Sequence, residues 1–252
     1  MNQILNYFGF PKESLIHEKV LVKDILNQLE LQTLDKKSLI NSIQSVYLEA
    51  LLDKDTTRIL EFIDDVYRYE SILVLAVVLK DNKNFNYTNE KIHQAFQNPV
   101  IAVYEYNNSY YISCSIKRQN KQDSDKTVID EIITTDNFCQ EEVMNPFLND
   151  LNYEKYKAKN LKQIIDVLST KLINEQLIQM INYYPKSKSD VQYTRNIIKE
   201  YNSIKSSIKQ LEDQYKRESM MSKKMDIHIE VQDKRSRLKD IETKMKEDNS
   251  NG

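Results

Sequence analysis

Four carboxylates and one lysine flank the strand-like segments in the middle of the chain, a combination that metal-dependent nucleases use. Such enzymes need two or three acids and a lysine that converge at the edge of a sheet. The candidates are Glu70, Glu105, Asp130, Glu131 and Lys117. The lysine follows Ser115-Ile116, so the acid that restriction-type nucleases place two residues before it is missing. The sequence therefore favours ordinary strand-end carboxylates, and a nuclease stays the less favoured alternative.

A short basic cluster could instead contact nucleic acid. Lys117, Arg118 and Lys121 follow Tyr110 and Tyr111, and basic groups beside aromatic rings can bind a phosphate backbone and stack on bases. The segment from residue 186 onward adds 16 basic against 12 acidic residues, whereas the whole chain has a net charge of −2. Both patterns are also common on half-exposed strands and solvated helices. A DNA-binding module is therefore the main alternative function.

Histidine and cysteine give no signal for a metal site. His17, His93 and His228 lie far apart and belong to no HExxH-type pair, and Cys114 and Cys139 stand alone. We therefore predict no metal and no cofactor, while a Cys–His nucleophilic pair stays open. Isolated cysteines also favour a reduced, cytoplasmic protein.

Glycine usage excludes several enzyme classes. The chain has two glycines, Gly9 and Gly252. A P-loop, a dinucleotide-binding turn and a nucleophile elbow each need glycine for positive φ or for close approach to phosphate. ATPase, kinase, Rossmann and α/β-hydrolase functions are therefore excluded. We predict no catalytic residues, and whether the chain is an enzyme stays open.

The composition is that of a soluble protein without a membrane partner. It is 40% hydrophobic and 29% charged. The longest apolar run extends from Ile72 to Leu79 and is too short to cross a bilayer. The first residues also lack the pattern of a signal peptide.

Apolar spacing predicts an α+β domain over residues 1–183. Helical periodicity indicates helices from Glu18 to Glu30 and from Lys36 to about Ala50. The apolar run Ile72–Leu79 predicts a buried strand, and Asn86 to Gln97 a short helix that ends before a proline.

Three further elements complete this domain. Asn107 and Asn108 separate two β-rich runs and predict a hairpin, because asparagine tolerates the left-handed conformation. The segment TVIDEIIT is a further strand, and Tyr156 to Tyr183 is a long helix. We thus predict an antiparallel or mixed sheet with packed helices.

Residues 184–252 carry two heptad seams and predict a long C-terminal coiled-coil segment. The two seams are out of phase, and the change falls on ESMMSKK at residues 218–224. One bent helix and a helical hairpin are both compatible with this change. Since this stretch has no glycine or proline, we slightly favour one bent helix. The predicted interface consists of Ile197, Tyr201, Ile204, Ile208, Leu211, Tyr215, Ile227, Val231, Leu238, Ile241 and Met245.

The order of these segments resembles a bacterial family catalogued as domain of unknown function number four-three-nine-one. The similarity extends over nearly the whole chain and is carried by SLINSIQSVYLEALL, SILVLAVVLKD, NEKIHQAFQNPVIAVYEY and SYYISCSIKRQ. The family has a Phe-Asn-basic-basic run in its charged tail, where this chain reads Met221-Ser222-Lys223-Lys224. The resemblance implies a gene neighbourhood with SNF2-type helicases and type III-like DNA methyltransferases.

The leading hypothesis combines the seams with this resemblance. The chain would be a non-enzymatic accessory or scaffolding subunit of a bacterial DNA modification, restriction or phage-defence complex, acting through protein–protein contacts. A helicase or DNA methyltransferase is the implied partner, and a homodimer through the coiled coil and contact with DNA remain open.

Overall fold

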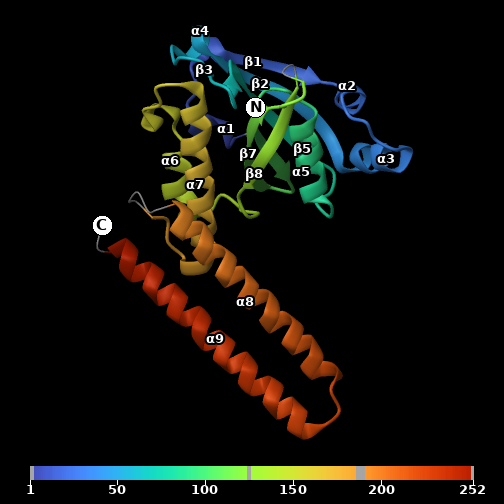
Figure 1. The fold of residues 1–252 in the computed structure, drawn as a ribbon, viewed down its shortest axis with the longest axis vertical. Helices are drawn as coiled ribbons and strands as arrows, with labels where there is room; N and C mark the ends of the chain where they lie inside the picture. The colour runs from blue at the N-terminus through green and yellow to red at the C-terminus, as the bar shows by residue number, and fades with distance from the viewer. Residues whose placement is uncertain (1–2, 124–125, 186–190, 251–252) are drawn as a thin grey trace. The chain divides into compact units, whose positions relative to one another are not determined.

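The computed structural model describes residues 3–123, 126–185 and 191–250 (Figure 1). Its internal contacts divide the chain into two units, Met1–Leu172 and Ile173–Gly252. In the described part of the chain, no helix combines the length and the apolar character that a membrane span requires.

A six-stranded mixed sheet forms the centre of the first unit. Its strand order is β1-β2-β5-β6-β7-β8, and all neighbours are antiparallel except β5 and β6. A separate two-stranded sheet pairs β3 with β4. The strands are β1 (Leu15–Val20), β2 (Ile43–Asp53), β3 (Phe62–Ile63), β4 (Arg68–Tyr69), β5 (Ser71–Leu79), β6 (Val100–Tyr106), β7 (Ser109–Gln119) and β8 (Thr127–Thr134). The predicted α+β class with a mixed sheet is confirmed.

Helices cover both faces of this sheet. Successive side chains of strand β7 point to opposite faces of the sheet. Ser113 and Cys114 therefore contact the helices on different faces. Ser113 contacts His93 of α5 (Phe85–Gln94), whereas Cys114 contacts Ser169 of α7 (Leu161–Ile181). Helix α5 is also the crossover between the parallel strands β5 and β6. The remaining helices of this unit are α1 (Leu5–Phe8), α2 (Val22–Asn27), α3 (Thr33–Ser42), α4 (Lys54–Thr57) and α6 (Asn145–Asp150), with 3₁₀ turns at Lys12–Ser14, Glu142–Met144 and Tyr153–Tyr156.

Two predicted helices near the N-terminus are wrong in part. Residues 18–20 belong to strand β1, and residues 43–50 belong to strand β2. The pairing of β2 with β5 shifts register between Ile43 and Ser45 and again between Leu48 and Ala50. These bulges stretch the spacing of buried residues beyond the usual two. The burial pattern of β2 therefore imitates helical periodicity.

The elements in the middle of the chain agree with the sequence prediction. Strand β5 begins one residue before the predicted apolar run and ends with it, and β8 coincides with TVIDEIIT. Asn107 and Asn108 both have positive φ, 49° and 61°, in the turn between β6 and β7. The left-handed conformation that asparagine tolerates therefore forms the two-residue turn of this hairpin, as predicted.

In the second unit, α8 (Val191–Arg217) and α9 (Met221–Ser250) form an antiparallel helical hairpin (Figure 1). Their contact cluster consists of Ile204, Ile208, Leu211, Ile227, Val231 and Leu238. The preference for one bent helix is therefore wrong. The prediction of one long coiled-coil segment is not confirmed either, because two helices of 27 and 30 residues pack on each other.

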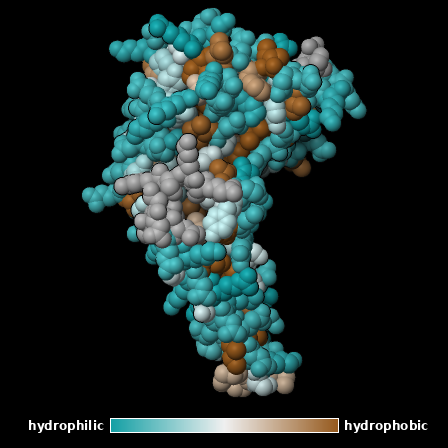
Figure 2. Space-filling view, turned by 60° about the vertical axis from the view of Figure 1, so that its left-hand side comes forward, coloured by the Kyte–Doolittle hydropathy of each residue, from teal (hydrophilic) through white to brown (hydrophobic). Residues whose placement is uncertain are grey.

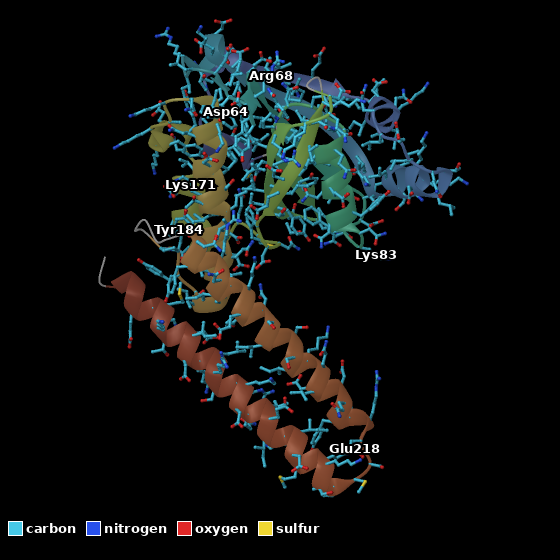
Figure 3. All side chains as sticks on the ribbon, viewed as in Figure 1. Asp64, Arg68, Lys83, Lys171, Tyr184 and Glu218 are labelled. Carbon is cyan, nitrogen blue, oxygen red and sulfur yellow. The ribbon has the colours of Figure 1, made fainter. Side chains whose placement is uncertain are left out.

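The carboxylate of Glu218 explains how the chain turns without glycine or proline. It accepts hydrogen bonds from the backbone amides of Ser219 (2.8 Å) and Met220 (2.9 Å) at the connection that Figure 3 labels. These two amides directly precede α9, and backbone amides at the start of a helix lack partners within the helix. The same bonds lower the pKa of Glu218. The Glu218 side chain thus stabilises a turn that contains no glycine.

Candidate functional site

The lysine of the predicted basic cluster lies in the protein interior. Lys117 is 2% exposed, and its Nζ donates to the carbonyl oxygens of His93 (2.7 Å), Phe96 (2.5 Å) and Asn98 (2.8 Å). These carbonyls belong to the last turn of α5 and the residues that follow it, where a cation is favoured by the helix dipole. Burial lowers the pKa of Lys117 to about 7. Its ammonium group therefore stabilises the end of α5.

The predicted nucleic-acid surface is correspondingly smaller. Since Lys117 is enclosed, the structure contradicts its role as a phosphate contact. Arg118 pairs with Asp130, with 2.7 Å between Nε and Oδ1, and Lys121 is exposed. Tyr110 is buried, and the Tyr111 ring stacks on Phe85 with centroids 3.8 Å apart. Contact with DNA stays a prediction for Arg118 and Lys121, without the aromatic partners.

The four candidate carboxylates do not converge. Glu105 pairs with Tyr110 across β6 and β7, whereas Asp130 lies beside Lys117 at the other end of β7. Seven residues of extended strand separate these positions, which is about 23 Å at roughly 3.3 Å per residue. Glu70 forms an ion pair with Arg68. Within the described residues, no three histidine, cysteine or acidic side chains are grouped to hold a metal ion.

A buried serine–histidine pair beneath α5 resembles a nucleophile and its base. His93 Nε2 lies 2.7 Å from Ser113 Oγ, and Ser113 Oγ donates to Asn89 Oδ1 at 2.8 Å. A hydroxyl has one proton, so His93 Nε2 must be the donor in its bond with Ser113. Burial, with Lys117 nearby, lowers the pKa of His93 to about 3. The hydroxyl proton of Ser113 thus points to Asn89 and away from His93, so His93 cannot act as its base. The pair instead holds α5 on the sheet.

The two cysteines lie in different surroundings. Cys114 is buried with its Sγ 3.3 Å from Ser169 Oγ, and Cys139 is exposed. These surroundings give no support to a Cys–His pair, which stays an untested alternative.

A different pair, which sequence reasoning did not select, has the features of a site. His17 Nδ1 donates to Glu49 Oε2 at 2.8 Å. The Glu49 side chain is 3% exposed, whereas that of His17 is 56% exposed, so the carboxylate is enclosed and the imidazole faces solvent. The His17 ring stacks on Tyr47, with centroids 5.3 Å apart and planes within 3°. The carboxylate fixes the imidazole through Nδ1 and leaves Nε2 outward.

The backbone around this pair is irregular on both sides. The pairing of β1 with β2 breaks between Leu15 and Glu18, and the pairing of β2 with β5 breaks between Leu48 and Ala50. His17 itself has a φ of 56°, a left-handed conformation that costs a non-glycine residue about 1–3 kcal/mol. Bulges are frequent beside functional sites, where they redirect a side chain. Here they place two residues of β1 opposite Glu49.

Glu49 also lines a small pocket on this side of the sheet. The pocket has a volume of about 120 Å³. Its walls are formed by Leu5, Asn6, Gly9, Phe10, Leu15, Glu49 and Ala50. Within the described residues, the bond from His17 is the only hydrogen bond of the Glu49 side chain. We call this arrangement the His17–Glu49 pocket.

The His17–Glu49 pocket has no signal in the sequence. Thirty-two residues separate the two side chains, and only the pairing of β1 with β2 brings them together. Part of this segment was predicted as helix, which would have placed Glu49 on a helical face. The pair became visible only with the sheet.

The predicted interface residues divide into four groups. Tyr201, Ile208, Ile227, Val231 and Met245 are buried, while Ile204, Leu211 and Leu238 are half-buried against the cluster. Tyr201 also donates from its hydroxyl to Glu242 Oε1 at 3.0 Å. Ile197 and Ile241 line a groove of about 430 Å³ between α8 and α9. Tyr215 is 38% exposed.

Exposed apolar side chains gather where α8 ends and α9 begins. Met221 is 71% exposed, and the others are at least one third exposed. We call this group the hairpin tip: Tyr215, Met220, Met221, Met225 and Ile229. Figure 2 shows apolar residues at this end of the hairpin, next to a largely hydrophilic helical surface.

Comparison with protein families places the chain. Residues 8–238 match the family model described as Domain of unknown function (DUF4391). The chain belongs to the DUF4391 family. No curated protein and no solved structure matches it.

The DUF4391 match extends across both units. It includes His17 and Glu49 in the first unit and the whole hairpin tip in the second. The family resemblance predicted from the ordered segments is therefore confirmed, and the name of the family assigns no chemistry to either place.

Proposed function

We propose that this DUF4391 protein is an accessory subunit that acts through protein–protein contacts. The observation that carries the proposal is the hairpin tip, where Met220, Met221 and Met225 are each more than half exposed. Methionine side chains are flexible and polarizable, and they are frequent on surfaces that adapt to a partner. Clusters of exposed apolar residues on soluble proteins commonly mark interaction sites.

The occupant that best fits the hairpin tip is a different protein with an apolar cleft. A handful of side chains presents an apolar area on the order of a few hundred Å², whereas a stable complex buries roughly 800 Å² on each partner. A second copy would present the same small convex end, and two convex ends bury little surface. A concave surface on a partner can enclose the tip and reach the flanking helix turns.

The charges beside the tip favour an acidic rim on that partner. Lys216 and Arg217 end α8, and Lys223 and Lys224 lie in the first turn of α9. Lys224 also lies over the Tyr215 ring, at 5.2 Å from its centroid. Charge complementarity of this kind contributes mostly to specificity and association rate.

The wider setting of the proposal is a bacterial DNA modification, restriction or phage-defence complex. It follows from the gene neighbourhood that the family resemblance implies, with a helicase or DNA methyltransferase as the partner. No residue described above distinguishes between these partners, so their identity is a question for the experiment.

The test is affinity purification of the full chain from its native host, followed by quantitative mass spectrometry. A Met221→Glu/Met225→Glu variant adds two charges to the hairpin tip, and glutamate is tolerated near a helix N-terminus. We expect this variant to lose at least 90% of a partner that the unchanged protein retains near stoichiometric amounts, in accordance with the loss of buried apolar anchors.

A matched control adds the same charges elsewhere on α9. Ser236 and Thr243 are exposed and lie outside the tip, so Ser236→Glu/Thr243→Glu should retain the partner. If the tip variant and the control retain equal amounts, the tip is not the docking surface. If a helicase or methyltransferase is the partner lost, the proposed setting is supported as well.

A further inference from the structure

The carboxylate of Glu49 is enclosed but poorly compensated. A carboxylate can accept about four hydrogen bonds. In the described part of the chain the Glu49 side chain accepts one, from His17 to Oε2, whereas its other oxygen, Oε1, accepts none and is not fully buried, so a ligand can reach it. Enclosing a carboxylate with few partners costs free energy unless an opposite charge or further donors compensate it. The site is therefore suited to a ligand that supplies both.

The pocket beside Glu49 limits the size of that ligand. Its volume of about 120 Å³ is somewhat below the roughly 150 Å³ of an apolar cavity that accommodates benzene. A group of four or five non-hydrogen atoms would fill it. The pocket is thus large enough for a short side chain or a small amine.

The walls of the pocket indicate the chemical class. Leu5, Leu15 and Ala50 contribute apolar surface, and Phe10 adds an aromatic ring. Glu49 and Asn6, which also line the pocket, each carry a side-chain oxygen that can accept hydrogen bonds. An apolar stem that ends in several N–H donors would match both kinds of wall, and an aromatic wall also attracts cations.

We propose that the His17–Glu49 pocket binds a small organic cation, an ammonium or guanidinium group on a short apolar stem. Glu49 is the charged contact. His17 is a positioning residue, since its Nδ1 holds Oε2 and leaves Oε1 for the ligand. The proposal goes beyond the protein–protein function above and involves the other unit of the chain, so each can fail without the other.

Two sources can supply this chemistry. One is a free small amine or guanidine, and the other is a lysine or arginine side chain on the surface of another protein. In both cases an ammonium or guanidinium group enters the pocket. The two sources differ in whether a polypeptide backbone continues outside the pocket.

The experiment is a nuclear magnetic resonance titration of the full chain at constant ionic strength. The probes are n-butylammonium and methylguanidinium, and n-butanol is the uncharged control. We expect saturable shifts of the His17 and Tyr47 ring resonances with both cations and none with butanol. Shifts of equal size with butanol, or no saturable shift with either cation, would overturn the proposal.

Variants separate the charge of Glu49 from the shape of the pocket. Glu49→Gln keeps the side-chain size and should weaken cation binding at least tenfold. Glu18→Gln removes an exposed carboxylate from the neighbouring strand β1 and should leave the affinity unchanged. Unchanged affinity in a folded Glu49→Gln protein would contradict the role of the carboxylate.

A second pocket variant guards against an unfolded Glu49→Gln protein. Leu15 lines the pocket but is 41% exposed, so Leu15→Phe narrows the pocket without removing a charge. It should weaken butylammonium binding more than binding of the smaller free ammonium ion. Equal effects on both ions would place the cation outside the pocket and overturn the proposal.

The source of the cation is decided by a blocked amino acid. N-acetyl-lysine N′-methylamide has the same ammonium stem as n-butylammonium and adds two peptide groups. Tighter binding of the blocked lysine would identify a protein side chain as the ligand. Weaker binding would identify a free amine, because the peptide groups then collide with the rim.

Discussion

At the scale of single residues, the charged side chain that looked most functional has a structural role. Lys117 ends a strand in the sequence, where it could contact phosphate. In the fold its ammonium group donates to three carbonyls around the end of α5. His93, which belongs to the same helix, is held neutral by burial, with a pKa lowered to about 3. Enclosure thus converts both groups from candidates for chemistry into supports of α5.

The lowered pKa of Lys117 predicts a pH dependence of stability. Burial lowers this pKa from 10.5 to about 7 in the folded protein. Between about pH 7 and pH 10.5 the unfolded chain therefore binds a proton that the folded protein has lost. The free energy of unfolding should rise with pH across this window. Urea unfolding at several pH values measures this slope.

Two variants isolate the contribution of Lys117 from that of other titrating groups. Lys117→Met keeps the apolar stem and should remove this part of the slope. It should also cost about 2 kcal/mol at pH 7, because buried carbonyls lose their donor. Lys121→Met, at an exposed position, should preserve the slope and change stability by less than about 0.5 kcal/mol. Equal slopes in the two variants would show that Lys117 does not titrate in this window.

At the scale of elements, the heptad seams pair two helices of one chain. The seams are out of phase because α8 ends at Arg217 and α9 begins at Met221, and each helix turns its own seam inward. The residues between them form a turn that the Glu218 carboxylate holds. Sequence periodicity identifies an apolar seam, but the partner of that seam is decided by the turn.

The pairing of α8 with α9 predicts which apolar residues stabilise the hairpin. Ile208 is 8% exposed and belongs to the contact cluster, whereas Ile229 is 53% exposed. We expect Ile208→Ala to destabilise the hairpin by about 2 kcal/mol, through lost burial and an incompletely filled space. Hydrogen exchange of the amides in residues 191–250 reports this change.

The matched change on the outer surface is the control for this prediction. Ile229→Ala removes the same atoms from the hairpin tip and should change the exchange rates of these amides only slightly. A comparable increase of the exchange rates in both variants would mean that the Ile229 side chain also stabilises the packing of α8 on α9.

At the scale of the whole molecule, charge argues against tight binding of DNA. The net charge is −2, and Lys117 no longer contributes to a basic surface. Arg118 is engaged with Asp130, and Lys121 is the remaining exposed member of the cluster. An electrostatic contact with the DNA backbone needs several basic groups at one surface.

Salt dependence measures how many phosphates the chain contacts. If both Arg118 and Lys121 contact phosphate, the logarithm of the affinity should fall by about 1.8 for each tenfold increase in salt. Fluorescence anisotropy with a labelled duplex gives this slope. We expect Arg118→Ala/Lys121→Ala to abolish it, while Lys54→Ala/Lys83→Ala, at exposed positions elsewhere, preserves it. A slope of about −4 or steeper would require another DNA surface.

The sequence by itself determined the features that depend on neighbours along the chain. The Asn107–Asn108 turn, strands β5 and β8 and the seams of α8 and α9 follow from turn chemistry, apolar runs and helical spacing. Each is specified by residues within about one or two turns or a few strand positions of one another. The order of these segments was also sufficient to recognise the family.

Only the tertiary structure decided the candidate site and the fate of the charged residues. Strand pairing at two bulges makes β2 a strand and brings His17 to Glu49. The packing of α5 on the sheet encloses Lys117 and leaves Arg118, its neighbour in the chain, outside. Burial and pairing arise from contacts between distant segments, and the identity of a single residue does not specify them. Those contacts determine whether a charge can meet a ligand.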